Sequence, residues 1–282
     1  MGNIDEKTVT GFGEEWSVYT QDELTDEQAR DMFDKYFSLF DWGSLPRDAE
    51  GFDMGCGSGR WARLTAPKVG KLYCIDASEQ ALSVAKTNLQ DQRNCEFIHA
   101  SVDELPLEND SMDFAYSLGV LHHIPDTLSG MNSCVAKLKP GAPFLVYLYY
   151  AFDNRPLWFR LVWKVSDVLR GFISHLPFRL KLLVTNVIAL LVYLPLAKLA
   201  LLLEKAGLNV ENIPLSAYRK MPFYMMRTDS LDRFGTRLES RFTKAEIRQM
   251  LEEAGLEKIK FRNGVPYWCA IGVKRPLPGD SN

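Results

Sequence analysis

The feature that most constrains the fold is a glycine loop between an apolar segment and a helical one. The text GFDMGCGSG, residues 51–59, predicts a short buried strand that enters a loop with Gly55, Gly57 and Gly59. Glycine lets the backbone turn sharply and approach a ligand, because no Cβ stands in the way. A strand, a loop of this kind and a helix indicate an α/β fold that binds its ligand beyond the carboxyl end of the strand.

Apolar strands and amphipathic helices alternate around this loop. After an initial helix over residues 23–40, we expect helices at 58–66, 78–90 and 127–139, and strands at 51–55, 71–76, 95–100, 112–119 and 143–151. Thr243 and Glu246 form a capping-box start for a last helix, and strands follow at 257–261 and 266–275. Near-continuous apolar strands that alternate with helices predict a parallel sheet covered on both faces. The expected fold is α/β, a doubly wound, Rossmann-like sheet of about seven strands.

The residues around the loop restrict the ligand. Asp76 ends the second strand, where an acid can accept hydrogen bonds from ribose hydroxyls. A pyrophosphate loop needs glycine where this chain has Arg60, and no nucleoside-triphosphate loop is present. The pattern therefore favours a nucleoside without a diphosphate and disfavours an NAD-type dehydrogenase.

Taken together, these segments resemble the class I S-adenosylmethionine-dependent methyltransferases, in the branch that contains quinone-biosynthesis and other small-molecule enzymes. DMGCGSGRW is similar to their cofactor loop, CIDASEQALSVAK to their ribose segment, and ASVDELPLENDSMDFAYSLGVLHHIPD to their adenine loop, fourth strand and following segment. The resemblance covers about residues 50–150 and resumes at 241–274. It implies S-adenosyl-L-methionine as the cofactor and a small organic molecule as the methyl acceptor.

The resemblance also implies roles for single residues. The methionine and ribose side of the cofactor would be held by Asp53, Gly55, Cys56, Gly57 and Gly59. The ribose hydroxyls and the adenine would meet Asp76, Ala77, Ser101, Val102 and Asp103, and the methionine end would meet the backbone of Ser117 and Leu118. Many relatives have an acid in place of Ser101, and a hydroxyl accepts a weaker hydrogen bond than a carboxylate. Asp103 is alternatively a loop residue with no contact to adenine.

Two adjacent histidines, His122 and His123, follow the fourth strand, where this architecture places the reacting methyl group. A neutral histidine can take the proton of an acceptor hydroxyl at pH 7. The alternative is that the pair only begins the next helix, as it does in similar enzymes. Tyr149 and Tyr150, at the end of the fifth strand, either line the acceptor pocket or pack in the core.

Near the N-terminus, FGEEWSVYT resembles the segment that folds over the cofactor in related enzymes. Trp16 and Tyr19 are therefore candidates for covering the methionine end and the acceptor. Plain packing of aromatic side chains beneath the first helix explains them equally well.

A long insertion separates the fifth strand from the last helix. We expect three segments: a cofactor-binding core over 1–152, a mainly helical insertion over 153–240, and core elements over 241–282. Loops and insertions on a rigid scaffold often carry specificity, so a cap over the acceptor is the favoured interpretation. Contact with an anionic membrane surface and a homodimer face remain open.

The apolar part of the insertion is the stretch LLVTNVIALLVYLPLAKLALLL. Its uncharged run from Leu182 to Ala197 has 16 residues, whereas a membrane span needs about 20. The core resumes after the insertion, which argues against a single crossing. Between Asn154 and Leu203 the insertion holds seven basic residues and one acid, Asp167, which suits a membrane surface.

Three arginines are candidates for binding an anionic group of the acceptor, because a guanidinium pairs well with a carboxylate or phosphate. They are Arg155, Arg233 and Arg237. Local ion pairs on a solvated surface are the alternative.

Composition bounds the remaining possibilities. A net charge of −3 gives no reason to expect nucleic acid as a partner. Five scattered cysteines without a C-x-x-C pair predict reduced thiols and no metal site. Reduced thiols are typical of a cytoplasmic protein. If the insertion binds lipid, the protein would be peripheral at a membrane. We expect a methyltransferase for a hydrophobic, amphipathic or lipid-linked acceptor, with oxygen favoured over carbon. The alternative is a non-catalytic binding or membrane-surface module with the same fold.

Overall fold

The computed structural model describes residues 2–21 and 23–276, which divide into two compact units. The core unit comprises residues 2–21, 25–151 and 238–276. The helical unit comprises residues 23–24 and 152–237. The chain leaves the core unit once and returns to it once after residue 25, so the helical unit is essentially one continuous insertion.

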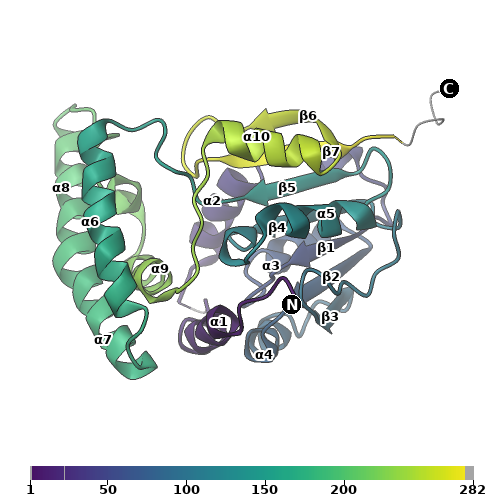
Figure 1. Ribbon diagram of the computed structural model, residues 1–282, viewed down its shortest axis with the longest axis horizontal. Helices are drawn as coiled ribbons and strands as arrows, with labels where there is room; N and C mark the ends of the chain where they lie inside the picture. The colour runs from purple at the N-terminus through teal and green to yellow at the C-terminus, as the bar shows by residue number, and fades with distance from the viewer. Residues whose placement is uncertain (1, 22, 277–282) are drawn as a thin grey trace. The chain divides into compact units, whose positions relative to one another are not determined.

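The described part of the core unit is built on one seven-stranded sheet with the order β3-β2-β1-β4-β5-β7-β6 (Figure 1). Strand β7 runs antiparallel to β5 and β6, and the other neighbours are parallel. The strands are β1 (Glu50–Met54), β2 (Lys71–Asp76), β3 (Cys95–His99), β4 (Phe114–Leu118), β5 (Pro143–Tyr147), β6 (Leu256–Phe261) and β7 (Cys269–Lys274). The predicted α/β, Rossmann-like sheet of about seven strands is confirmed.

Helices connect the strands of this sheet. They are α1 (Glu6–Val18), α2 (Asp26–Tyr36), α3 (Ala62–Thr65), α4 (Glu79–Asn88), α5 (Thr127–Lys137) and α10 (Lys244–Glu253), with the short turns η1 (Trp42–Ser44), η2 (Ala66–Lys68) and η3 (Leu121–His123). Helix α2 starts later than the helix expected over residues 23–40, because Thr25 caps its start with a capping box, and it ends at Tyr36. Helix α1, which the sequence pattern did not predict, packs against α4.

The central strands are buried on both sides of the sheet. Strand β4 is buried along its whole length, and Phe52, Phe114 and Phe144 are fully enclosed side chains on three adjacent strands. This burial explains why the strands read as continuous apolar runs rather than as alternating ones. It also holds the carboxyl ends of β1, β2 and β4 in fixed positions around the glycine loop.

The helical unit has a hydrophobic core of its own. Its elements are α6 (Leu157–Ile173), α7 (Phe178–Ile188), the π-turn η4 (Ala189–Tyr193), α8 (Leu194–Lys205), η5 (Ser216–Lys220) and α9 (Phe223–Gly235). Helix α9 packs against both α6 and α7. One cluster of buried residues in this unit comprises Ile173, Ala189, Tyr193, Ala197, Met226 and Phe234.

Helices α7 and α8 join through η4 into one helical run, Phe178–Lys205, of 28 residues. Pro195 explains the wide turn, because a proline ring clashes with the carbonyl four residues earlier and has no N–H for it. By length and composition this run is long enough to cross a membrane. Our length argument from the 16 uncharged residues was therefore too strict, and the argument from the return of the chain to the core remains.

Candidate active site

A cavity opens beyond the carboxyl ends of the parallel strands of the core unit. Its walls come from the N-terminal segment and α1, from the glycine loop, and from the segments that follow β2, β3 and β4. The predicted site residues that line it are Gly55, Cys56, Gly57, Asp76, Ala77, Ser101, Val102, Leu118 and His123. Residues from four separate sequence segments therefore meet in one cavity.

The glycine loop needs glycine for two physical reasons. Gly55, Gly57 and Gly59 have φ angles of 79°, 54° and 77°, in the region that other residues rarely adopt. A Cβ on Gly55 would collide with Val120, and one on Gly57 would lie 3.0 Å from the indole of Trp16. Gly59 is outside the cavity and approaches Leu89 instead. The loop thus provides a cradle of bare backbone at the cavity floor.

Asp76 is held at the cavity by two backbone hydrogen bonds. Its Oδ2 accepts from the N–H of Gly57 at 2.8 Å and its Oδ1 from the N–H of Ser78 at 2.8 Å. Burial raises the pKa of this carboxyl group, and the same two N–H groups oppose the shift. Each carboxylate oxygen keeps a second lone pair. These are well placed for the two hydroxyls of a ribose.

Asp53 lies behind the cavity wall rather than in it. Met54 lines the cavity, and neighbouring residues of a strand face opposite sides of the sheet, so Asp53 points the other way. Its carboxyl group is fully buried between Cys74 and Tyr116 in the strand register. Burial raises its pKa well above the usual range. Asp53 is therefore not among the residues that line the cavity in this structure.

The adenine side is formed by Ser101 and Val102, with Asp103 outside the lining. The hydroxyl of Ser101 donates to Asp103 Oδ1 at 2.7 Å, and Asp103 Oδ2 accepts from the N–H of Asn3 at 2.8 Å. The hydrogen bond from Ser101 lowers the pKa of Asp103. With its proton directed at a carboxylate, the Ser101 oxygen presents lone pairs, which suits an adenine amino group.

The two residues at the end of β4 have different positions. Leu118 lines the cavity, whereas Ser117 is fully buried and its hydroxyl donates to the carbonyl of Met54 at 3.0 Å. Ser117 therefore ties β4 to β1 directly beneath the glycine loop.

The structure separates the two histidines. His123 lines the cavity, and its Nδ1 lies 2.7 Å from the carbonyl oxygen of Leu238. Since a carbonyl can only accept, Nδ1 carries the proton, and in the neutral ring Nε2 holds the lone pair. His122 is fully buried, with its ring 3.8 Å from that of Tyr149. Burial, and then the charges of His123 and Arg241, lower its pKa well below the usual range.

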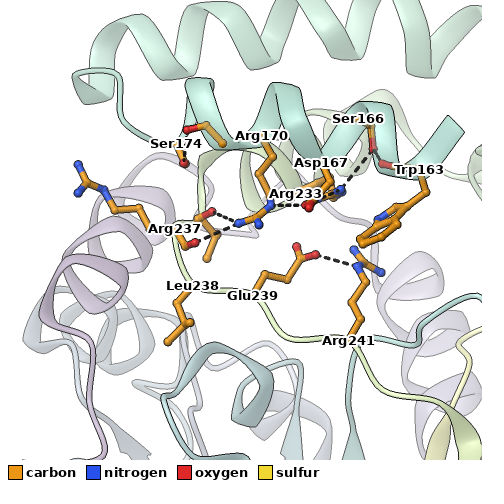
Figure 2. Close-up of polar contacts among 12 residues, drawn as sticks. Trp163, Ser166, Asp167, Arg170, Ser174, Arg233, Arg237, Leu238, Glu239 and Arg241 are labelled. Carbon is orange, nitrogen blue, oxygen red and sulfur yellow. Dashed lines mark hydrogen bonds and ion pairs between the residues drawn. The ribbon is translucent and has the colours of Figure 1, made fainter. Parts of the chain in front are cut away.

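A strap, residues 238–242, fixes this histidine pair. Besides the Leu238 carbonyl, the N–H of Ser240 donates to the carbonyl of His122 at 2.8 Å. Arg241 places its guanidinium 4.9 Å from the ring centre of Tyr149. It also donates to the carboxylate of Glu239 at 2.7 Å (Figure 2). We did not predict these roles, although the charged run around Arg241 was visible in the sequence.

The tyrosines that we named as substrate candidates do not line the cavity. Tyr149 lies against His122, so it belongs to the histidine cluster. Tyr150 packs against Tyr267 with ring centres 5.4 Å apart, and Tyr19 is almost fully buried. For Tyr150 the structure gives the core-packing alternative.

The three arginine candidates lie in the helical unit. Arg155 is buried and donates to the carbonyl of Glu211 at 2.7 Å. Arg233 lies 3.4 Å from the carboxylate of Asp167, and the side chain of Arg237 points away from this network (Figure 2). The guanidinium groups of Arg155 and Arg233 are thus engaged within their own unit.

Trp16, one of the aromatic candidates from the N-terminal region, lines the cavity, whereas the contacts of Asn3 and Arg60 were not predicted. The N-terminal segment lines one wall, and Asn3 fixes it by exchanging hydrogen bonds of 2.7 and 2.8 Å with the backbone of Asp126. Arg60 also lines the cavity and stacks its guanidinium 4.3 Å from the ring centre of Trp61. Within residues 2–21 and 23–276, no cluster of three or more His, Cys, Asp or Glu side chains is arranged to hold a metal ion.

Part of this chain is similar in sequence to known methyltransferases. Residues 52–146 match a family model described as a methyltransferase domain. A demethylmenaquinone methyltransferase of Staphylococcus aureus is 31% identical over 98 residues, covering 34% of this chain and 41% of that protein. Its counterpart from Bacillus licheniformis is 28% identical over 101 residues, covering 35% and 44%. The chain therefore spans less than half the length of these curated relatives.

A solved structure is similar over a larger part of the chain. The crystal structure of a methyltransferase from Bacillus halodurans, described as putative in its name, superposes with a TM-score of 0.51. It covers 82% of this chain and 71% of that one at 16% sequence identity. This similarity supports the fold, and the family match supports the cofactor-binding half of the core unit.

Proposed function

We propose that this chain, in which residues 52–146 match a methyltransferase domain, binds S-adenosyl-L-methionine and methylates a small hydrophobic or amphipathic acceptor. Oxygen is the favoured target atom, with carbon second. The observation that carries the proposal is that one cavity holds both the glycine cradle with Asp76 and the ring of His123. The cavity thus combines residues that suit a nucleoside with a side chain that can accept a proton.

The residues of the cavity suit this cofactor. Asp76 would accept from the ribose hydroxyls, and Ser101 from the adenine amino group. The bare backbone at Gly55 and Gly57 would lie against the methionine part, and Arg60, which also lines the cavity, would pair with its carboxylate. Bound S-adenosylmethionine supplies a methyl group that is activated by the positive sulfur.

The protein's own chemical contribution is alignment and proton removal. His123 would take the proton of an acceptor hydroxyl on Nε2, because the Leu238 carbonyl keeps the other proton on Nδ1. Val9, Phe12, Leu118 and Ile124 give the cavity an apolar wall that excludes water. A dry site favours a reaction in which the positive charge on sulfur disappears.

The nature of the acceptor is also a proposal. The apolar wall supports a hydrophobic or lipid-linked molecule, and two relatives carry names that contain demethylmenaquinone. We propose that the helical unit acts as a cap on this acceptor.

All five cysteines are free thiols, which supports a cytoplasmic protein.

Calorimetric titration tests whether the protein binds the proposed cofactor. S-adenosylmethionine should bind, and NADH should not. Asp76→Ala should weaken binding about 10- to 100-fold, since it removes hydrogen bonds to a charged group. Asp91→Asn, an exposed change outside the cavity, is the control. No binding of S-adenosylmethionine at millimolar concentration would leave only a non-catalytic module.

A second experiment tests the base. His123→Ala should lower kcat about 100-fold or more with an oxygen acceptor while leaving cofactor affinity unchanged. His122→Phe keeps a ring against Tyr149 and should retain most of the turnover. Equal turnover in wild type and His123→Ala would assign the histidine a structural role.

A further inference from the structure

The helical unit has polar groups inside and apolar groups outside. On α6, Asp167 Oδ1 accepts from Arg170 Nε at 2.8 Å, and Ser166 Oγ accepts from Arg233 of α9 at 3.2 Å (Figure 2). Arg170 also donates to the carbonyl of Thr236 at 3.1 Å. The polar face of α6 is therefore turned toward other residues of its own unit.

Helix α7 has the same arrangement. Lys181 is buried and donates to the carbonyl of Gly235 at 3.0 Å. The carbonyl of Thr185 accepts from Ser230 at 2.9 Å, and Asn186 Oδ1 accepts from Arg227 at 2.8 Å. The polar residues inside the apolar stretch thus serve to bind α9.

The apolar side chains of these helices face outward. We define the apolar face as eight exposed residues of α6 and eight of α7, η4 and α8: Leu157, Trp158, Leu161, Val162, Val165, Val168, Leu169, Phe172, Leu180, Leu183, Val187, Leu190, Leu191, Val192, Leu199 and Leu202. Their exposed fractions reach 74% at Leu157 and 73% at Phe172. In the described core unit, by contrast, Val18 and Val265 are the large apolar residues with comparable exposure.

On α6 the spacing shows one continuous apolar strip rather than scattered residues. At 3.6 residues per turn, the eight residues of α6 occupy adjoining rows on one side of the helix. In the helical run Phe178–Lys205, only 22% of the most apolar 18-residue window is buried. An apolar surface of this extent marks an interaction site.

The charges around the apolar face have one sign. The exposed charged side chains between residues 157 and 205 are all basic: Lys164, Arg179, Lys198 and Lys205. The two acids of this range are neutralised in ion pairs, Asp167 with Arg170 at 2.8 Å and Glu204 with Arg219 at 2.7 Å. By helical spacing, Lys164 borders the apolar rows of α6, and Lys198 and Lys205 share one edge of α8. Basic side chains at such margins can reach phosphate groups while their stems stay in apolar surroundings.

We infer that the apolar face lies in the interfacial layer of an anionic lipid bilayer, parallel to the membrane plane and without crossing it. Outward apolar rows with basic margins are the pattern of a surface-bound helix. The inward polar groups of α6 and α7 are bound to α9, so neither helix has an apolar circumference that a span would need. Two copies joined through this face would bring like charges together, which disfavours a dimer.

Co-sedimentation with vesicles tests this inference on the full chain, without cofactor or acceptor. Vesicles of phosphatidylcholine with phosphatidylglycerol should bind the protein about tenfold or more tightly than phosphatidylcholine alone. Binding should weaken as salt is added, because salt screens the basic side chains. The assay measures the fraction of protein bound to vesicles and not methyl transfer. A failure of the methyltransferase proposal would therefore leave this result unaffected, and an absence of vesicle binding would not affect the methyltransferase proposal.

Two sets of variants separate the apolar and the electrostatic contributions. Leu161→Gln, Val165→Gln and Leu191→Gln together should weaken binding to both vesicle types about tenfold or more. Lys164→Gln, Lys198→Gln and Lys205→Gln together should remove the preference for phosphatidylglycerol. Val265→Gln and Lys86→Gln, exposed changes in the core unit, are the matched controls and should bind as wild type does.

Three results would overturn the inference. The first is an absence of vesicle binding by the wild type. The second is a dimer in light scattering that the glutamine variants of the apolar face dissociate, which would make the face a protein interface. The third is protein that remains with the vesicles in alkaline carbonate and high salt and needs detergent for release, which would indicate a span.

Discussion

At the scale of single residues, the adjacent histidines His122 and His123 have different environments and therefore different properties. His123 lies at the cavity with its tautomer set by Leu238, whereas His122 is enclosed against Tyr149. A fully buried imidazole is costly to charge, so its pKa falls well below the usual range. His122 is thus neutral in the fold and contributes to stability in a pH-dependent way.

The sign of this contribution is fixed by proton linkage. Below about pH 6.5 the unfolded chain protonates His122 while the folded chain does not, so folding loses stability as the pH falls. Above that pH both states are neutral and the contribution vanishes. His122→Phe should therefore flatten the loss of thermal stability between pH 7.5 and 5 as followed by circular dichroism.

A control keeps this prediction specific. Thr87→Ala, an exposed change at a side chain that does not titrate, should retain the wild-type pH profile. If His122→Phe also retained that profile, the burial of His122 would not be coupled to its protonation.

At the scale of elements, the two capping boxes show what local sequence can determine. Thr243 and Glu246 exchange side-chain and backbone hydrogen bonds at the start of α10, with distances of 2.7 and 3.2 Å. Thr25 and Gln28 do the same for α2. These helix starts depend on residues three apart, and the Thr243 box was predicted from the sequence.

Removal of one cap has a calculable effect. Thr243→Ala should lower the free energy of unfolding by about 1 kcal/mol, because the N–H of Glu246 loses its partner. Urea denaturation gives the value from the shift of the midpoint. Thr87→Ala removes a hydroxyl from the exposed side of α4 and should change stability much less. Equal effects would mean that the cap contributes nothing particular.

Other elements depend on contacts that the sequence does not display. Helix α1 was missed because its partner is α4, far along the chain, and its own text is weakly patterned. The strap was missed for the same reason, since His123 and Leu238 are separated by 115 positions. The glycine loop, Asp76 and the strands were predictable, because each depends on a few neighbouring residues with a strong conformational or burial preference. Asp53 was assigned to the cofactor by resemblance, and the structure places it outside the residues that line the cavity.

At the scale of the whole molecule, the chain combines a sheet that carries the cofactor cradle with an insertion that has its own core. The sheet does not need the insertion for its pairing, since β5 lies beside β7 and the strap lies beside the end of β5. Each unit can thus be examined for a separate property.

Deletion of the insertion tests this separation. Residues 153–237 replaced by a short Gly/Ser linker should leave a folded core that binds S-adenosylmethionine as the wild type does. Acceptor turnover should be lost, because the proposed cap is removed. Calorimetry and circular dichroism measure the first expectation, and a methyl-transfer assay measures the second. Wild-type turnover without the insertion would contradict the cap.

The hydrogen bond of 2.9 Å between the N–H of Ala151 and the carbonyl of Phe242 closes the root of the insertion. The entropy of closing a loop grows only slowly with its length, about 0.6 kcal/mol for each doubling. A long insertion between two paired residues therefore lowers the stability of the sheet only slightly. The length of the insertion can therefore change at little cost in stability while the sheet keeps the same cofactor site.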